Sequence, residues 1–333
     1  MDQSLKPAWS VGMGDPPVIL GFSLGRTLAP RGDVEGVGDD SIGRIADGLI
    51  LPAGEILLVD DALQVLWRYG PDGAQRQLIG RPGQGPGEFR GPRSATMVRG
   101  ALAVLDAGIG LQFFVPAGDG FTFSRGVRLT LEADDLCVLD SALVVQGTAA
   151  GLPILHLFSQ QGELNRSFGQ IYNSPNISIN EAIGSTGRLV CDGDNKLVIY
   201  APRGALGEVR AYRTDGTPVW RTIFANFRAN RMEDHPGGWR VTVSPDGVHS
   251  LHALTAIPGR GLLVQWTYRT YDEIVARASY GTILSYLLNP VTGEPIGPDT
   301  TLPPILAATD STVLVAYEDP EPRFEVRALL PRR

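Results

Sequence analysis

Apolar and polar positions follow a rhythm that recurs six times along the chain. Each repeat has a short aliphatic or β-branched run, a polar connector, a second apolar run and a turn rich in Asp, Gly or Pro. Runs of this kind predict pairs of adjacent β-strands joined by tight turns. The repeats occupy residues 55–73, 102–120, 143–162, 197–216, 262–293 and 313–331.

Each repeat is interpreted as the second and third strands of a four-stranded antiparallel sheet, with the flanking apolar segments as the first and fourth strands. The spacing of about 40 to 65 residues fits the repeats of a β-propeller. We therefore predict an all-β, six-bladed β-propeller, in which one domain spans residues 1–333. The expected blades are approximately 42–82, 93–130, 132–170, 180–225, 248–300 and 305–331, with an added N-terminal strand within 7–23.

The N-terminal strand is expected because the last repeat is one strand short where the chain ends at Arg333. Either Pro7–Val11 or Val18–Phe22 could pair beside the C-terminal strand in the last blade and close the ring, which would remove an open sheet edge. The competing prediction is seven blades, with Trp239–Val248 as the core of a degraded unit.

The first repeat runs on through GAQRQLIGRPGQGPGEFRGP, from Gly73 to Pro92, and this segment closely resembles an NHL repeat. The resemblance implies a six-bladed architecture like that of NHL, TolB or strictosidine-synthase propellers. It implies no single function, because such propellers include scaffolds, ligand sensors, lactonases and lyases. The glycines of the segment are expected to turn the chain into the next blade, with Phe89 packed between blades.

Composition narrows the classes of partner. With 43% hydrophobic and 20% charged residues among 333, the chain is expected to fold around a sizeable core. The formal net charge of -7 argues against a general nucleic-acid-binding surface, which would need a basic face. The uncharged stretch Ser141–Gly162 contains Gln146, Pro153 and His156, so two strands around a turn fit it better than a transmembrane segment.

The two cysteines, Cys137 and Cys191, are too few for a disulfide framework and are interpreted as buried thiols. Whether they interact is left open at this point. The first residues contain no continuous apolar run typical of a signal peptide. A periplasmic or secreted location is therefore expected only if a leader has been removed, and the protein is expected to be a monomer.

Candidate catalytic and metal-binding groups give weak signals. Asp60 and Asp106 end second strands at equivalent positions, which favours capping of the following loops over catalysis. His249 and His252 would point to opposite faces of a strand, so neither is predicted as a metal ligand. Calcium is the one cofactor considered, but its candidate oxygen ligands crowd into one connector, where loop turns explain them better; they are Asn173, Asn176, Asn180 and Glu181.

The strongest functional signal is a pair of long connectors in the fifth repeat, at 226–248 and 267–281. Loops on one face of a propeller commonly carry its binding groups. The run YDEIVARAS in the second connector predicts a short helix with Ile274 and Ala278 facing inward. The predicted ligand-binding residues, with two from the first inter-blade loop, are Arg90, Arg93, Arg228, Arg231, His235, Arg269, Tyr271, Asp272 and Arg277.

These arginines and tyrosines favour planar and charged contacts, so the expected partner is a protein, peptide, sugar or small anionic ligand. Solvated loops without a binding role are the open alternative. A non-enzymatic recognition or scaffold propeller is the favoured function, and no catalytic residue is assigned. A calcium-assisted ester or lactone hydrolase is the second candidate.

Overall fold

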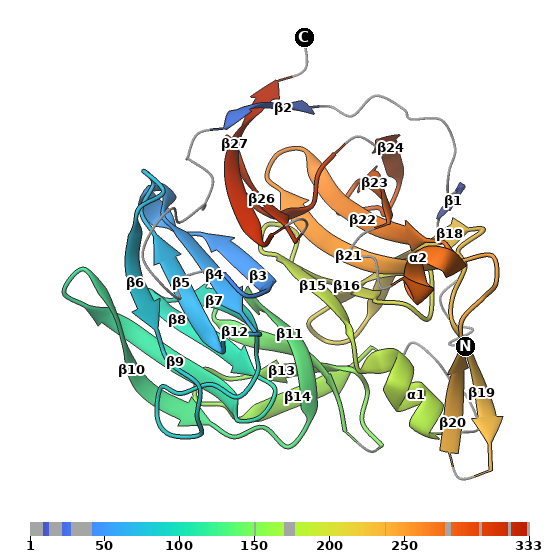
Figure 1. Ribbon diagram of the computed structural model, residues 1–333. Helices are drawn as coiled ribbons and strands as arrows, with labels where there is room; N and C mark the ends of the chain where they lie inside the picture. Colours follow the sequence, from blue (N-terminus) through green and yellow to red (C-terminus); the bar gives the residue numbers. More distant parts are fainter. Residues whose placement is uncertain are drawn as a thin grey trace. The chain divides into compact units, whose positions relative to one another are not determined.

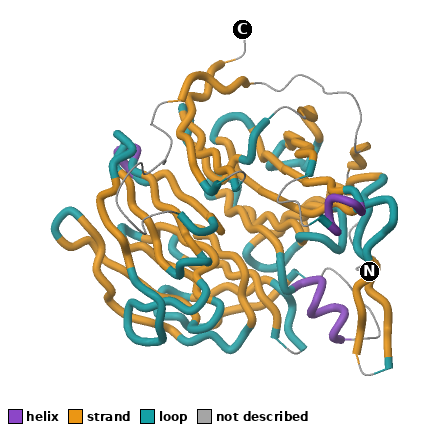
Figure 2. Tube along the Cα trace, in the orientation of Figure 1, coloured by secondary structure: helices purple, strands orange, loops and turns teal. Residues whose placement is uncertain are grey.

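The computed structural model describes residues 9–12, 22–27, 42–149, 151–169, 177–236, 238–276, 281–299, 302–318 and 321–331. Strands account for most of this length (Figures 1 and 2). They form six blades of four antiparallel strands, one of which gains a fifth, parallel strand at its edge, and this confirms the all-β, six-bladed β-propeller predicted from the repeats. The contact pattern divides the chain into two compact units, and the assignment of 1–333 to one domain stays a prediction.

Unit 1 comprises Met1–Leu20, Leu131–Ala256 and Gly261–Leu302, and it holds blades three, four and five. Blade three is β11 (Glu132–Leu139), β12 (Ala142–Thr148), β13 (Leu155–Phe158) and β14 (Leu164–Phe168). Blade four is β15 (Gly187–Asp192), β16 (Leu197–Pro202), β17 (Glu208–Arg213) and β18 (Pro218–Ala225). Blade five is β21 (Val248–Ile257), β22 (Gly261–Arg269), β23 (Thr282–Leu288) and β24 (Pro295–Asp299).

Unit 2 comprises Gly21–Thr130, Ile257–Arg260 and Pro303–Arg333, and it holds blades one, two and six. Blade one is β3 (Ile45–Ile50), β4 (Ile56–Asp60), β5 (Val65–Tyr69) and β6 (Gln75–Ile79). Blade two is β7 (Pro92–Val98), β8 (Ala101–Asp106), β9 (Gly110–Ala117) and β10 (Gly120–Val127). Blade six is β25 (Ile305–Ala308), β26 (Thr312–Tyr317), β27 (Arg323–Pro331) and β2 (Phe22–Thr27).

The middle strands of the blades are the apolar runs that make the repeat visible in the sequence. All five residues of β4 and of β5 are buried, whereas β6 and β14, which form sheet edges, are largely exposed. A strand that is covered on both faces has no reason to alternate in polarity. Within unit 1, one apolar cluster joins blades three and four, and another joins blades four and five.

The glycine-rich segment after blade one acts as the sequence predicts. Gly80 and Gly87 have φ angles of 78° and 76°, a left-handed conformation that glycine adopts without strain. Phe89 is fully buried and packs in the cluster shared by blades one and two, 5.8 Å from the ring of Phe114. The segment is therefore a structural connection between neighbouring blades of unit 2.

The N-terminal strand that completes the last blade is β2, which pairs antiparallel with β27. It begins at Phe22, so it meets the predicted Val18–Phe22 segment at one residue; the rest of that segment lies outside the described residues. The other candidate was wrong for this role. β1 (Trp9–Gly12) pairs in parallel with β18, at the edge of blade four, because the backbone groups of that edge strand are open to a further strand.

Two connectors of unit 1 contain more regular structure than the sequence predicts. The connector before blade five forms a hairpin, β19 (Arg231–His235) and β20 (Gly238–Thr242), which is a separate two-stranded sheet and not a seventh blade. Helix α1 (Ile177–Gly184) contains Asn180 and Glu181, which were wrongly assigned to loop turns. Ile179 and Ile183 are buried on one side of α1, and that packing favours the helix over a loop.

The uncharged stretch Ser141–Gly162 forms β12 and β13 around a turn, as predicted. Among the described residues, no helix is long and apolar enough to cross a membrane. The part of the chain that the structure describes also contains helix α2 (Tyr271–Val275) and a 3-10 turn, η1 (Pro52–Gly54).

Candidate functional site

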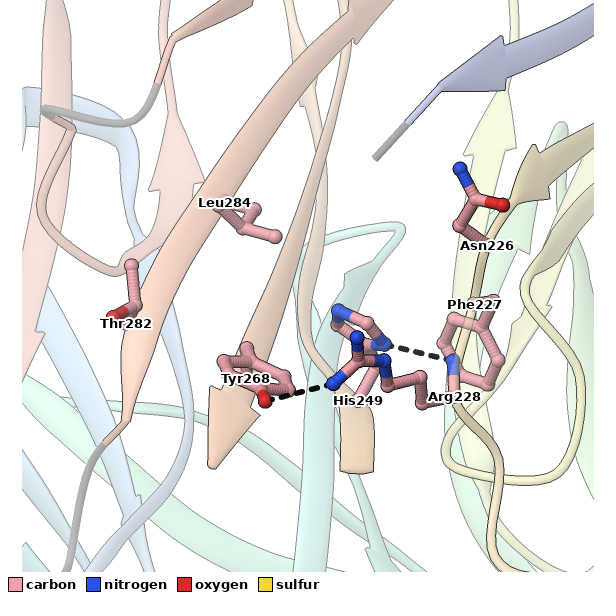
Figure 3. A pocket seen from close by; sticks show the side chains of 7 residues that line it. All are labelled: Asn226, Phe227, Arg228, His249, Tyr268, Thr282 and Leu284. Atoms are coloured by element: carbon pink, nitrogen blue, oxygen red, sulfur yellow. Dashed lines mark hydrogen bonds between the residues drawn. The ribbon is translucent and has the colours of Figure 1, made fainter. Parts of the chain in front are cut away.

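An open cavity of about 690 Å³ lies in unit 1, where blade five meets the segment that leaves blade four (Figure 3). The first wall is the chain segment that comes directly after β18 in the sequence. The second wall is formed by the adjacent strands β21, β22 and β23. The cavity is within the size range of small-molecule sites. Its lining residues are Asn226, Phe227, Arg228, His249, Tyr268, Thr282 and Leu284.

The first wall depends on a sharp turn at the end of β18. Asn226 has a φ angle of 63°, a left-handed conformation that asparagine tolerates better than most residues. The turn brings Phe227 back over blade five, where its ring lies 5.0 Å from that of Trp266 in an edge-on contact. Phe227 is therefore anchored in the apolar cluster of blades four and five, and it fixes the position of Arg228.

The second wall is one face of blade five. Tyr268 pairs with Thr282, and Trp266 pairs with Leu284, in the register of β22 and β23. Directly opposed residues point to the same face of a sheet, so these four side chains share the face that lines the cavity. Leu284 is buried and forms the apolar base, Trp266 is buried beside it, and Thr282 is exposed.

His249 lies between the two walls with 6% of its surface exposed. Its ring is 5.3 Å from that of Phe227 and 5.0 Å from that of Tyr268. The backbone N–H of Arg228 donates to Nδ1 of His249 at 2.8 Å, and the backbone N–H of His249 donates to the carbonyl of Arg228 at 2.8 Å (Figure 3). Burial, and then the charge of Arg228, lowers the pKa of His249 to about 4.

The guanidinium of Arg228 is held against Tyr268. Nη1 donates to the phenol oxygen of Tyr268 at 3.0 Å and also to the backbone carbonyl of Asp246. The hydroxyl of Tyr268 donates to that same carbonyl at 2.7 Å. In the part of the chain that the structure describes, no acidic side chain forms an ion pair with Arg228, so the positive charge at this wall is not neutralised by a carboxylate.

The predicted helix of the second connector is confirmed as α2. Thr270 caps it: its hydroxyl accepts from the backbone N–H of Glu273 at 3.3 Å, and the Glu273 carboxylate accepts from the backbone N–H of Thr270 at 2.7 Å. These hydrogen bonds lower the pKa of Glu273. Ile274 is half-buried, and Ala278 lies outside the described residues.

Of the predicted ligand-binding residues in unit 1 whose side chains the structure describes, only Arg228 lines the cavity. Arg269 ends β22 next to Tyr268, and Tyr271 and Asp272 lie exposed at the start of α2. Arg231 and His235 belong to the β19–β20 hairpin, with Nδ1 of His235 3.0 Å from the carbonyl of Pro236; the side chain of Arg231 is not described, and Arg277 lies outside the described residues.

Arg90 and Arg93 belong to unit 2. Arg93 is part of β7 and not of a loop, and it forms an ion pair with Asp61 at 3.4 Å. The backbone N–H of Arg90 donates to Asp106 at 2.7 Å. Their role in ligand binding, like that of the other predicted residues, stays a prediction.

The aspartates at the ends of second strands are loop caps, as predicted. The Asp60 carboxylate accepts from the backbone N–H groups of Gly43 at 2.7 Å and of Leu63 at 2.9 Å, and from the indole N–H of Trp67 at 3.1 Å. Asp106 is buried and also accepts from backbone N–H groups. These contacts hold the following loops against the strand ends.

His252 lies three residues after His249 in β21, and burial followed by the charges of Arg188 and Arg203 lowers its pKa to about 4. Among the described residues, no group of three His, Cys, Asp or Glu side chains could hold a metal ion. The calcium candidates are not tested: Asn173 and Asn176 lie outside the described residues, and the side chains of Asn180 and Glu181 are not described.

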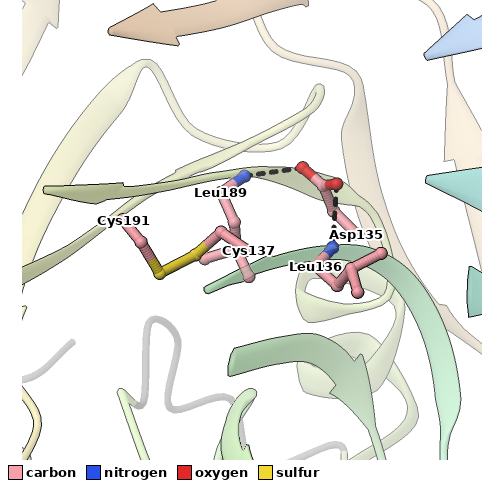
Figure 4. The surroundings of a disulfide bond; sticks show 5 residues. All are labelled: Asp135, Leu136, Cys137, Leu189 and Cys191. Carbon is pink, nitrogen blue, oxygen red and sulfur yellow. Dashed lines mark hydrogen bonds between the residues drawn. A yellow bond between two sulfur atoms is a disulfide. The ribbon is translucent and has the colours of Figure 1, made fainter. Parts of the chain in front are cut away.

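The two cysteines form a disulfide, so the interpretation as buried thiols was wrong (Figure 4). Cys137 in β11 and Cys191 in β15 join blades three and four across a sequence separation of 54 residues. Next to them, the carboxylate of Asp135 accepts from the backbone N–H groups of Leu189 at 2.7 Å and of Leu136 at 2.9 Å. The packing of blade three beside blade four brings the cysteines together, and no short spacing motif reveals it.

No protein-family model matches the chain, and no curated protein sequence does. A solved structure of a "putative exported protein" from Bacteroides fragilis is similar over 97% of this chain and 99% of its own, with 13% identity and a TM-score of 0.61. That likeness shows the fold alone. The NHL repeat itself is not confirmed.

Two further solved structures are less similar. Virginiamycin B lyase from Staphylococcus aureus is 12% identical over 84% of this chain and 79% of its own, with a TM-score of 0.46. The β-propeller domain of Cps50 (Swd1) from Myceliophteria thermophila is 7% identical over 87% of this chain and 98% of its own, with a TM-score of 0.49.

Proposed function

We propose that this protein is a non-enzymatic recognition β-propeller that binds a small anionic ligand in the cavity of unit 1. The supporting observation is the guanidinium of Arg228, which Tyr268 and the carbonyl of Asp246 hold at the wall. Among the described residues, no carboxylate lines the cavity. A fixed cation beside apolar and aromatic walls favours an anion with an organic body.

The state of His249 supports binding over catalysis. A general base needs a free lone pair on a group whose pKa lies near the working pH. In His249 the Nδ1 lone pair accepts the Arg228 N–H, and the pKa is lowered to about 4. The ring is therefore suited to donate a hydrogen bond from Nε2 and poorly suited to remove a proton from a substrate.

We also propose that the protein works in an oxidising compartment, either the periplasm or outside the cell. The disulfide between Cys137 and Cys191 supports this, because such bonds persist in exported proteins and are rare in the cytosol. Thiol alkylation of cell extracts, with and without prior reduction, tests it. Blocked cysteines in the unreduced sample are expected, and freely alkylated Cys137 and Cys191 would contradict the proposal.

A ligand screen tests the binding function. Small anions, sugars and short peptides would be assayed by thermal shift against the wild type, Arg228→Gln and the control Arg240→Gln, which removes an exposed arginine of β20. Anionic ligands should stabilise the wild type and the control but not Arg228→Gln. Ligands that stabilise all three proteins equally would reject the cavity as the site.

The calcium-assisted hydrolase remains the alternative, and an ester and lactone panel separates it from a binding protein. Purified protein would be assayed before and after chelation, together with metal analysis. We expect no turnover in either state. Tightly held calcium that is lost together with hydrolytic activity would overturn the non-enzymatic proposal.

A further inference from the structure

The hydrogen bonds around His249 fix which ring nitrogen carries the proton. Nδ1 accepts from the backbone N–H of Arg228, so it must present a lone pair. In a neutral imidazole the other nitrogen, Nε2, then carries the hydrogen. His249 lines the cavity, and it therefore adds a directed N–H donor to the charge of Arg228.

The guanidinium of Arg228 supplies further donors. Only Nη1 has hydrogen-bond partners among the described residues, namely Tyr268 and the carbonyl of Asp246. Nε and Nη2 are left to a ligand, and Arg228 is exposed. The phenol of Tyr268 adds no donor to the cavity, because its hydrogen is already given to Asp246.

These polar groups match one kind of anionic head. One guanidinium and one neutral imidazole N–H offer a single positive charge, which balances a monoanion with two acceptor oxygens. A phosphate dianion would bring a second negative charge, and among the described residues that line the cavity no cation besides Arg228 balances it. The remaining lining favours an apolar body, because Leu284 is buried at the base and Phe227 is anchored beside it.

We infer that the cavity recognises a small monocarboxylic acid with a flat or compact apolar body, whose carboxylate accepts from Arg228 and from the Nε2–H of His249. This rests on the proposed binding function and names the ligand class for the same site. A sugar, a phosphate ester or an organic cation fits these groups less well. The free C-terminus of a peptide is a different occupant, and the test separates it.

Matched probes with one body and different heads test the inference. The dissociation constants of 2-naphthoate, 2-naphthamide and 2-naphthyl phosphate would be measured by calorimetry on the full chain at pH 7. We expect 2-naphthoate to bind at least about tenfold more tightly than the amide, since hydrogen bonds to charged groups are the stronger ones. Equal binding of all three probes, or tighter binding of the phosphate, would reject the inference that the cavity prefers a carboxylate.

Two substitutions of His249 separate its two nitrogens. His249→Asn can keep an acceptor for the Arg228 N–H but removes the Nε2 donor, so it should weaken 2-naphthoate about tenfold and leave 2-naphthamide unchanged. His249→Gln can restore a donor near Nε2 and should recover part of the affinity. Unchanged 2-naphthoate binding in a folded His249→Asn variant would reject the role of His249.

The outcomes keep this inference apart from the proposed function. If screened anions need Arg228 but 2-naphthoate does not bind, the cavity remains the site and the monocarboxylate class is wrong. If no screened ligand depends on Arg228, the proposed function itself fails. Tighter binding of a free-acid dipeptide than of both its amide and 2-naphthoate would replace the small acid with a peptide C-terminus.

Discussion

The second strands of blades one and two end differently from the second strand of blade five. In blades one and two they end in Asp60 and Asp106, whose carboxylates accept from several backbone N–H groups of the following loops. In blade five the second strand ends in Arg269, next to Tyr268. There the guanidinium of Arg228 donates to the hydroxyl of Tyr268, and that hydroxyl donates to a backbone carbonyl, so the guanidinium keeps further N–H donors. The first arrangement satisfies its own polar groups, whereas the second leaves donors for a ligand.

The contrast separates structural polar residues from binding residues. A buried carboxylate surrounded by backbone donors has little capacity left for a ligand, although it is strongly conserved in position between the two blades. An arginine at a cavity wall without an acid partner keeps its charge available. The recurring carboxylates of blades one and two therefore indicate a structural role, whereas the charge of Arg228 supports a binding role.

The largest effect should come from removing a strand-end cap. Asp60→Ala leaves the N–H groups of Gly43 and Leu63 and the indole of Trp67 without their acceptor, so the free energy of unfolding should fall by about 3 kcal/mol or more. Urea unfolding measures it. The exposed control Asp72→Ala should change stability far less than Asp60→Ala does. Equal effects of the two substitutions would contradict the structural role of the cap.

The buried histidines should make the protein sensitive to acid. In the unfolded chain His249 and His252 bind protons near pH 6.5, but in the folded protein their pKa values are about 4. Lowering the pH from about 6.5 to 4 therefore favours unfolding, by up to about 3 kcal/mol for each histidine. Urea midpoints measured from pH 7 to pH 4 should fall, and less steeply in His249→Asn. An unchanged slope in that variant would show that His249 does not titrate in this way.

Loss of the Arg228 charge should affect binding far more than stability. Arg228 is exposed, so Arg228→Gln should change the free energy of unfolding by about 1 kcal/mol or less. The affinity for 2-naphthoate should fall at least about tenfold. Calorimetry and urea unfolding on the same samples give both quantities. A large loss of stability with unchanged binding would show that Arg228 has a structural role, like that of the Asp60 and Asp106 caps.

The smallest effect on binding is expected from substitutions in the two long connectors of blade five. A variant with Arg231, Arg269 and Tyr271 all changed to alanine should weaken the binding of 2-naphthoate less than Arg228→Gln does, because neither Arg269 nor Tyr271 is among the described residues that line the cavity. The same titration measures it. Complete loss of binding in a folded triple variant would move the site from the cavity to the connectors, as the loop lengths first suggested.

Much of the fold could be predicted because its physical causes repeat. The buried middle strands give continuous apolar runs, and the Asp60 and Asp106 caps recur at the same place in the repeat. Helix α1 was not predicted, because its sequence, ISINEAIG, shows helical spacing only through Ile179 and Ile183. The neighbouring residues favour turns. The disulfide could not be predicted because its two cysteines lie in separate blades and meet only where those blades pack side by side.

The site was found only in part. Connector length led to Arg228, but Phe227 and Tyr268 resemble ordinary aromatic residues at strand ends. His249 was considered only as a metal ligand. Its role depends on a backbone N–H from another blade and on its burial, and neither is visible in the order of residues. Connector length was the one signal available, because the missing aspartate at the end of β22 is shared by β12, β16 and β26.

Nuclear magnetic resonance of ¹⁵N-labelled histidine tests the central claim most directly. At pH 7, the long-range ¹H–¹⁵N spectrum should show His249 neutral, with the hydrogen on Nε2, and that hydrogen should shift downfield when 2-naphthoate is added. Assignment by His249→Asn identifies the signals. A His249 ring that is charged at pH 7, that carries its hydrogen on Nδ1, or that ignores saturating 2-naphthoate would contradict the account.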